Sequence, residues 1–142
     1  SADLAVTRHS DIIVTATSSK TAFLTPDLVR PGTFIAAVGA DNSDKSEIAP
    51  ALYAKAQAVV DALEQCVEIG DLHHALEAKA VTPKHVHATL AELVAGQKLG
   101  RRDDQAITLF DSSGMGLQDV AAAAAIYRRA MERGAGSQLP LN

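Results

Sequence analysis

Residues 34–41 have the sequence FIAAVGAD, a short apolar run that is closed by a glycine and an aspartate. Three more apolar runs of strand length occur along the chain, at residues 12–16, 58–61 and 106–110. None of the four alternates cleanly between apolar and polar residues, which is typical of strands buried on both faces of a parallel sheet. The pattern therefore predicts an α/β fold organised as one unit.

The segments between these runs have the features of short helices or irregular connections. Pro50 suits the first turn of a helix over 50–55, and Asp71 suits the N-cap of a helix that runs to residue 78. Further helices are predicted over 64–70, 88–95 and 117–132. The last is the strongest prediction, because its run of five alanines has the highest intrinsic helix propensity.

Composition and charge narrow the classes of partner. The 142 residues carry 13 Lys and Arg against 17 Asp and Glu, a net charge of −4, and aromatic residues make up 4%. This balance gives no electrostatic or stacking support for a nucleic-acid partner. No apolar run approaches the roughly 18 residues of a membrane span, and the first residues lack a secretory signal. Cys66 is the single cysteine, which favours a reducing, cytoplasmic location.

The sequence contains no glycine-rich phosphate loop. In nucleotide-binding α/β domains such a loop joins the first strand to a helix whose N-terminus receives the phosphates. Gly114-Met115-Gly116 comes closest to the G-x-G-x-x-G pattern but lacks its third glycine. As a dinucleotide-binding motif it is weak.

The residues that follow the predicted strands are candidates for a binding site, because open parallel sheets bind ligands outside the carboxyl ends of their strands. Residues 17–18, 39–41 and 111–114 follow three of the runs and are small, hydroxylated or acidic. Asp41 could act as a general acid or base if its surroundings move its pKa towards neutrality, or it could simply start a turn. Lys45 could reach a cofactor phosphate or ribose, or lie in solvent.

Other reactive side chains give weaker patterns. His73 and His74 are adjacent, so on a helix they point about 100° apart, which disfavours a shared metal ion. His85 and His87 have no carboxylate or cysteine cluster beside them, so no metal site is expected. Cys66 fits a small buried apolar residue, and the G-x-S-x-G motif of serine hydrolases is absent.

Four segments, taken together and in order, resemble the ornithine cyclodeaminase/mu-crystallin family. They are DIIVTATSS (11–19), LTPDLVRPGTFIAAVGADNSDKSEI (24–48), VVDALEQCVEIGDL (59–72) and ITLFDSSGMGLQDVAAA (107–123). The resemblance implies a partial Rossmann-like parallel sheet with flanking helices that lacks the first βαβ half. Residues 1–116 would be the C-terminal half of an NAD(P)-binding domain, and 117–142 a long helix and tail leading back to a missing substrate and dimer domain.

The resemblance also implies roles for single residues. It places Asp41 at the acid/base aspartate of the cyclodeaminase and alanine dehydrogenase branches. The other implied contacts are Thr17, Val38, Gly39, Ala40, Lys45 and Ser112 with the dinucleotide, and Ser113 with the substrate. These expectations rest on the resemblance alone.

By the same resemblance, the chain is a fragment of an enzyme that uses NAD or NADP and acts on a small amino or imino acid. The reaction would be cyclodeamination, imine reduction or amino-acid dehydrogenation. The cyclodeaminase has Gly-Gly-Asp where this chain has Gly39-Ala40-Asp41, which counts against ornithine cyclisation. The isolated chain is expected to be inactive and to form a homo-oligomer that covers the sheet edge at 12–16. The alternative is a non-catalytic, truncated oligomeric or binding protein of the same family.

Overall fold

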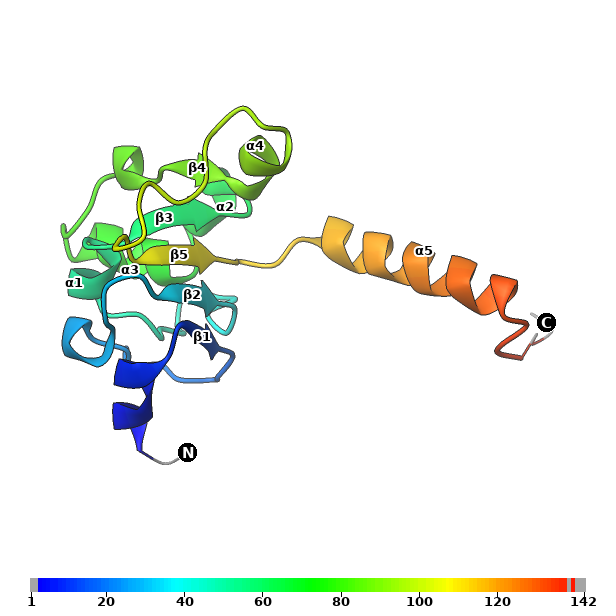
Figure 1. Cartoon of the computed structure of the whole chain (residues 1–142), viewed down its shortest axis with the longest axis horizontal. Helices are drawn as coiled ribbons and strands as arrows, with labels where there is room; N and C mark the ends of the chain where they lie inside the picture. The colour runs from blue at the N-terminus through cyan, green and yellow to red at the C-terminus, as the bar shows by residue number, and fades with distance from the viewer. Residues whose placement is uncertain (1–2, 138, 140–142) are drawn as a thin grey trace.

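The computed structural model describes residues 3–137 and 139 and contains a five-stranded, fully parallel sheet (Figure 1). Its strands are β1 (Ile12–Thr15), β2 (Phe34–Ala37), β3 (Gln57–Val60), β4 (Ala88–Thr89) and β5 (Thr108–Asp111). Their order in space is β1-β2-β5-β3-β4, so the last strand inserts between β2 and β3, and β1 lies at an edge. The predicted α/β fold and parallel sheet are confirmed, and four of the strands lie where the apolar runs placed them.

Three short helices cover one face of this sheet. The helices of the described chain are α1 (Pro50–Tyr53), α2 (Leu63–Cys66), α3 (Asp71–Glu77), α4 (Leu90–Val94) and α5 (Gly116–Glu132), with 3₁₀ turns η1 (Leu4–His9), η2 (Pro26–Leu28) and η3 (Pro83–His85). Residues of α1, α2 and α3 pack with alternate strand residues into one core, in which Ile35, Leu52, Leu72 and Leu109 are buried. Burying one such aliphatic side chain contributes about 1.5–3 kcal/mol, so this layer stabilises the sheet from one side.

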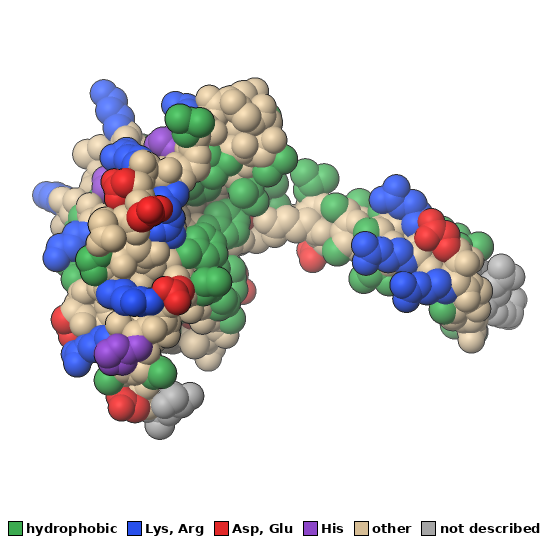
Figure 2. All heavy atoms as spheres, in the orientation of Figure 1, with side chains coloured by type: hydrophobic (Ala, Val, Ile, Leu, Met, Phe, Trp, Pro, Cys, Tyr) green, Lys and Arg blue, Asp and Glu red, His purple; other side chains and the backbone are tan. Residues whose placement is uncertain are grey.

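The opposite face of the sheet is open. Ile12 and Val14 on β1 are 66% and 64% exposed, whereas their strand neighbour Ile13 is buried. Apolar side chains gather over the strands in Figure 2, and a hollow of roughly 370 Å³ there is lined by residues that include Phe34 and Phe110. The expectation that the strands are buried on both faces is therefore wrong for this face. Among residues 3–137 and 139, α4 and the loop after it border the hollow through Leu90, Leu93 and Arg101, while Ile12 and Val14 of β1 stay exposed.

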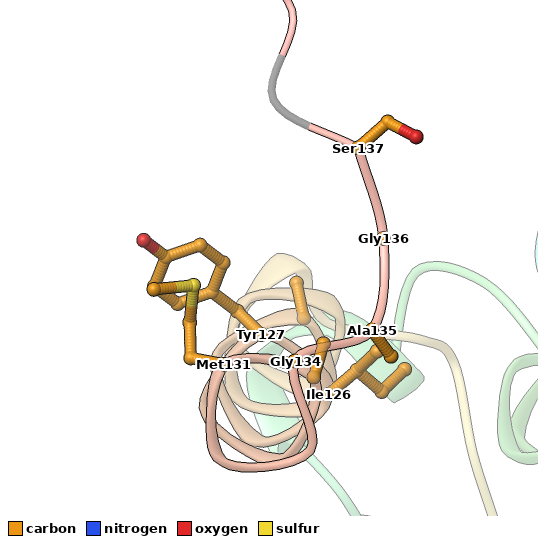
Figure 3. Close-up of a pocket in the computed structure, with 9 residues that line it drawn as sticks. Ile126, Tyr127, Met131, Gly134, Ala135, Gly136 and Ser137 are labelled. Atoms are coloured by element: carbon orange, nitrogen blue, oxygen red, sulfur yellow. The ribbon is translucent and has the colours of Figure 1, made fainter.

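Helix α5 projects from the domain and none of its described residues is buried (Figure 1). It begins within one residue of the predicted start at 117 and ends at the predicted residue 132. Ile126, Tyr127 and Met131 line a hollow of roughly 720 Å³ with the turn that follows the helix (Figure 3). The predicted tail to 142 includes residues 138 and 140–142, which lie outside the described residues. No helix in the described part of the chain is long and apolar enough to cross a membrane.

Two predicted helices differ from the structure. The segment 88–95 is not one helix, because Ala88 and Thr89 are extended and pair with β3 before α4 begins. The Thr89 hydroxyl accepts from the amide of Glu92 at 3.3 Å and the Glu92 carboxylate accepts from the amide of Thr89 at 2.8 Å, a capping box. Helix α2 ends at Cys66 rather than at 70, and Gly70, with φ 86°, precedes α3.

Candidate functional site at the carboxyl ends of β1, β2 and β5

Three of the predicted loops lie at one edge of the sheet. Strands β1, β2 and β5 are consecutive neighbours, and Thr15, Ala37 and Asp111 occupy matching positions in them. Because the strands are parallel, the segments 17–18 and 39–41 leave the sheet beside the segment that follows β5. The structure therefore brings together the strand ends that the sequence singled out.

A buried carboxylate joins two of these loops. Glu47 is fully buried and accepts hydrogen bonds from the amide of Thr17 at 2.6 Å and from the amide of Gly39 at 3.0 Å. A Cβ on Gly39 would lie 2.5 Å from the amide nitrogen of Thr17 and would overlap the Glu47 carboxylate. Glycine at this position is therefore required by the close approach of the loops. The sequence analysis missed Glu47, and no spacing in the sequence marks it.

Asp71 holds the chain around Glu47 in place. Its Oδ1 accepts from the amides of Glu47 and Ile48 at 2.8 and 3.0 Å and from the Ser46 hydroxyl at 3.3 Å. Burial raises the pKa of Asp71 above its ordinary value. The predicted N-cap role of Asp71 is wrong: the N-cap is Gly70, and the Asp71 side chain binds the 46–48 segment instead.

Asp111 connects the end of β5 to the helices behind the sheet. Its Oδ2 accepts from the amide of Leu72 at 2.8 Å and from the Tyr53 hydroxyl at 3.2 Å. Burial, together with the negative charge of Asp71, raises the pKa of Asp111 to about 7. This carboxyl is almost fully enclosed, so it acts within the core and not on a ligand in solvent.

Asp61, beyond the end of β3, organises the loop after β5. It accepts from the hydroxyls of Ser112 and Ser113 at 3.1 and 2.8 Å and from the amide of Gly114 at 2.8 Å. Burial raises the pKa of Asp61. The hydrogen bonds from Ser113 and from the amides of Ala62 and Gly114 lower it by more, so the pKa of Asp61 lies below its ordinary value. Ser113 is buried, so its expected contact with substrate, like that of Ser112 with cofactor, stays a prediction.

Asp41, in contrast, faces solvent beside Lys45. Its carboxylate is 57% exposed and its Oδ1 lies 2.8 Å from the Lys45 ammonium. The hydrogen bond from Lys45 lowers the pKa of Asp41, so the shift towards neutrality on which its acid/base role was conditional is not present in this arrangement. The turn is closed by Asn42, whose Oδ1 accepts from the amides of Asp44 and Lys45 at 3.0 and 3.1 Å. The Asp41 side chain is therefore not needed to close the turn.

The exposed surface around Asp41 is partly apolar and also carries the ammonium groups of Lys20 and Lys45. Val38 is 41% exposed at the end of β2, and Thr17 is exposed beside it, whereas Ala40 is buried. A shallow polar hollow of roughly 360 Å³ lies alongside, between the loops after β1 and β2. Its lining consists of Ser18, Lys20, Asn42, Ser43, Asp44 and Lys45. Lys20 pairs with Asp44 at 3.3 Å and Lys45 pairs with Asp41 at 2.8 Å, so an anionic ligand here would have to displace one of these carboxylates.

Cys66 takes no part in this surface. Its side chain is fully buried, and burial raises the pKa of the thiol to about 12. A thiol that stays protonated at neutral pH is a poor nucleophile. The prediction of a small buried residue is confirmed.

A parallel sheet with loops gathered at the strand ends defines part of a Rossmann-like NAD-binding domain. The chain belongs to the ornithine cyclodeaminase/mu-crystallin family, whose model matches residues 1–134.

Solved structures agree with this assignment. An archaeal alanine dehydrogenase dimer with bound NAD is similar with a TM-score of 0.82 at 39% identity, over 93% of this chain and 41% of that one. The iminosuccinate reductase of Paracoccus denitrificans, in complex with NAD+, gives 0.87 at 36% identity, over 98% and 43%. The Δ1-pyrroline-2-carboxylate reductase of Thermococcus litoralis, in complex with NADH and L-proline, gives 0.86 at 32% identity, over 96% and 42%. The chain spans about two fifths of the length of the curated relatives it matches.

Proposed function

We propose that this chain forms the nicotinamide-side half of an NAD(P)-dependent enzyme that acts on a small amino or imino acid. Residues 1–116 supply the C-terminal half of the dinucleotide-binding domain, and 117–142 lead to a second, substrate-binding domain. Helix α5 supports this division, because it projects from the sheet and none of its described residues is buried (Figure 1).

The observation that carries the proposal is the exposed Asp41 carboxylate at the strand-end edge, paired with Lys45. A bound NAD(P) would supply hydride exchange with the substrate carbon. Asp41 would hold or move the proton on the substrate nitrogen, in keeping with its ionised and accessible state. When Lys45 turns away, Asp41 loses the hydrogen bond that lowers its pKa, and the pKa rises towards its ordinary value of 3.8.

The residues at this edge fit the nicotinamide half of a dinucleotide. The exposed Val38 side chain offers an apolar surface for a planar ring, and the hydroxyl of Thr17 lies on the neighbouring loop. The Ser112 hydroxyl, half-buried on Asp61, is the third candidate contact. The sequence has no G-x-G-x-x-G, so the phosphates need a loop from elsewhere, and the choice between NAD and NADP depends on it.

Reduction or dehydrogenation is the favoured reaction within this proposal. The relatives with the solved structures described above are dehydrogenases and reductases, and Ala40 stands where the cyclodeaminase pattern has glycine. Cyclodeamination remains the second reaction to assay, because a lysine cyclodeaminase also has this fold, at a TM-score of 0.76.

The test is a chimera in which this chain replaces the matching segment of the P. denitrificans iminosuccinate reductase. Imine reduction, amino-acid oxidation and cyclodeamination are assayed with NAD and with NADP. Asp41→Asn is expected to lower kcat by about 10²–10⁴-fold, the usual contribution of a general acid or base. Asp104→Asn, exposed in the loop that precedes β5 and so at the opposite edge of the sheet, is the control and keeps activity. Equal kcat in the two variants would remove Asp41 from this role.

The open apolar sheet face favours a second candidate, a non-catalytic protein that associates through this face. An NADH fluorescence titration of the 142-residue chain separates the two. Saturable binding that weakens in Lys45→Met but not in Lys84→Met, which removes an exposed lysine beside the amino ends of β3 and β5, supports a cofactor site at the strand ends. Assembly without any NADH binding supports the non-catalytic alternative.

A further inference from the structure

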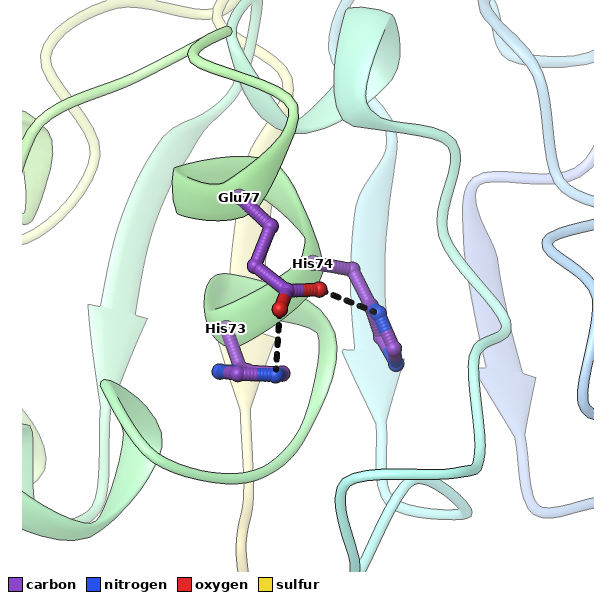
Figure 4. A group of neighbouring side chains, drawn as sticks. All are labelled: His73, His74 and Glu77. Atoms are coloured by element: carbon purple, nitrogen blue, oxygen red, sulfur yellow. Dashed lines mark ion pairs between the residues drawn. The ribbon is translucent and has the colours of Figure 1, made fainter.

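Three side chains of α3 converge outside the strand-end site. The ligand atoms of His73, His74 and Glu77 all lie within 4.8 Å of one another (Figure 4). The Glu77 carboxylate is 3.5 Å from Nε2 of His73 and 3.8 Å from Nδ1 of His74. The sequence disfavours a metal ion shared by these adjacent histidines, and this stays a prediction, but in the structure both rings turn towards the carboxylate one helical turn further along (Figure 4).

The remaining ring nitrogens show which nitrogen carries the proton in each neutral histidine. Nδ1 of His73 lies 3.2 Å from the carbonyl oxygen of Val67, and Nε2 of His74 lies 2.8 Å from the carbonyl oxygen of Lys45. A carbonyl only accepts, so each of these nitrogens carries the hydrogen. The other two nitrogens face the Glu77 carboxylate, so each must either carry a proton and donate it to Glu77 or share a positive ion with Glu77.

We propose that His73, His74 and Glu77 form a binding site for a divalent transition-metal ion of the Zn²⁺ type. Two imidazole nitrogens and one carboxylate oxygen are a ligand set that Zn²⁺ accepts, with a fourth position left for water. In a tetrahedral zinc site with bonds near 2 Å, neighbouring ligand atoms are roughly 3.3 Å apart. The 3.5 Å between Nε2 of His73 and the Glu77 carboxylate is close to this value. All three ligand atoms lie within 4.8 Å of one another, so small movements of the side chains bring them to this spacing.

The carbonyl groups behind the histidines provide the support that metal sites usually have. An imidazole ligand normally donates its second N–H to a carbonyl or carboxylate, which fixes the orientation of the ring. Here one of these carbonyls belongs to Lys45, in the loop that carries Asp41. A metal on Nδ1 of His74 would polarise its Nε2–H and strengthen the bond to Lys45, so the ion would also hold the 41–45 loop against α3.

The experiment uses the 142-residue chain in a buffer free of chelators. Zn²⁺ is titrated calorimetrically, and Co²⁺ is titrated by absorption, since four-coordinate Co²⁺ has intense visible bands. One ion per chain is expected, with affinity reduced about tenfold or more in His73→Gln, His74→Gln and Glu77→Gln. His9→Gln, which removes an exposed histidine far from α3, is the matched control and binds as the unchanged chain does.

A measurement on the unchanged chain keeps the test valid where a variant folds poorly. Histidine ring NMR signals of His73 and His74 are expected to move together on adding one equivalent of Zn²⁺, while that of His9 stays in place. The proposal is overturned by the absence of saturable one-to-one binding. It is equally overturned by folded variants that keep the original affinity, or by ring signals that move elsewhere.

Discussion

Carboxylates near the strand ends differ in what surrounds them, and this decides what each can do. Glu47, Asp71 and Asp111 are fully enclosed and accept hydrogen bonds from backbone amides and hydroxyls of the protein, although Oδ2 of Asp71 and Oδ1 of Asp111 have no partner among the described residues. Asp61 binds the serines and an amide of the next loop. Asp41 alone among these five has a mostly exposed carboxylate, with a flexible ammonium as its charged partner. A ligand can therefore compete for Asp41 without dismantling the fold.

The pairing of Asp41 with Lys45 gives the first prediction. Lys45→Met removes the hydrogen bond and charge that lower the pKa of Asp41, so the pKa is expected to rise towards its ordinary value of 3.8. The measurement is an NMR titration of the Asp41 side-chain carboxyl in the 142-residue chain. Lys20→Met, which removes the partner of Asp44, is the control and leaves the Asp41 curve where it was. An unmoved pKa in Lys45→Met would show that the pair does not form in solution.

The buried Asp111 gives a prediction about stability and pH. Its pKa is about 7 in the folded chain and returns to about 3.8 on unfolding. Between these values the folded chain keeps a proton that the unfolded chain releases, so the free energy of unfolding falls as the pH rises from about 4 to about 7. The difference amounts to on the order of 4 kcal/mol. Asp111→Asn is neutral at every pH and removes this part of the dependence.

Urea unfolding of both proteins over that pH range checks the prediction. The raised pKa of Asp71 leaves a smaller slope of the same sign in the variant. Asp119→Asn, at an exposed position on α5, is the control and follows the unchanged chain. Parallel curves for Asp111→Asn and the unchanged chain would mean that Asp111 is ionised in the fold throughout.

At the residue scale, the sequence predicted the residues whose role depends on their position directly after a strand. It missed the residues whose role depends on contacts between distant segments of the chain. Gly39 and Asp41 were found because the carboxyl ends of parallel strands gather at one edge. Glu47 and Asp71 bind backbone groups, and their 24-residue separation has no period that a sequence pattern could reveal. The convergence of His73 and His74 was missed for the same reason, since the ring orientations depend on carbonyls of residues 67 and 45.

At the scale of elements, the junction of β1 and β2 depends on one glycine. The loops after these strands approach so closely that a methyl group at Gly39 meets the Glu47 carboxylate and the amide of Thr17. Gly39→Ala is therefore expected to destabilise the fold by about 1–3 kcal/mol, the usual cost of overpacking. Gly100→Ala is the matched control, because a Cβ there meets nothing within 4 Å. Urea unfolding at one pH compares them, and equal midpoints would contradict the close approach.

The elements themselves were largely predictable, because four strands are apolar runs that end in small or polar residues. The exception is β4, whose two residues are too few to give a period, although Thr89 and Glu92 already carry the capping-box spacing that begins a helix at 90. The insertion of β5 between β2 and β3 was not predictable either. Strand order depends on how the layers pack, and an apolar run contains no information about its neighbours in space.

At the scale of the whole molecule, one face of the sheet is exposed. The strands are apolar on both faces, so this face requires a cover. The core helices α1, α2 and α3 pack on one side, whereas on the other side only α4 and the loop after it, among the described residues, border a hollow over Phe110, and Val14 faces solvent. Apolar strand faces of this kind are rarely left in water by stable monomers. In the isolated chain, a second copy is the available cover, and the unpaired edge of β1 adds backbone donors and acceptors to the same surface.

The last prediction follows from this exposed surface. The 142-residue chain is expected to self-associate in a concentration-dependent way, and Val14→Lys is expected to weaken that association at least about tenfold, because it places a charge in an apolar contact. Val14 is 64% exposed, so the substitution leaves the fold of each copy intact. Val94→Lys is the matched control, since Val94 is 82% exposed on α4 and does not line the hollow on the sheet. Light scattering and sedimentation over a range of concentrations measure the effect.

A monodisperse monomer, or equal association of the two variants, would show that the sheet face is not the contact surface. The apolar flank of α5 would then be the next surface to substitute.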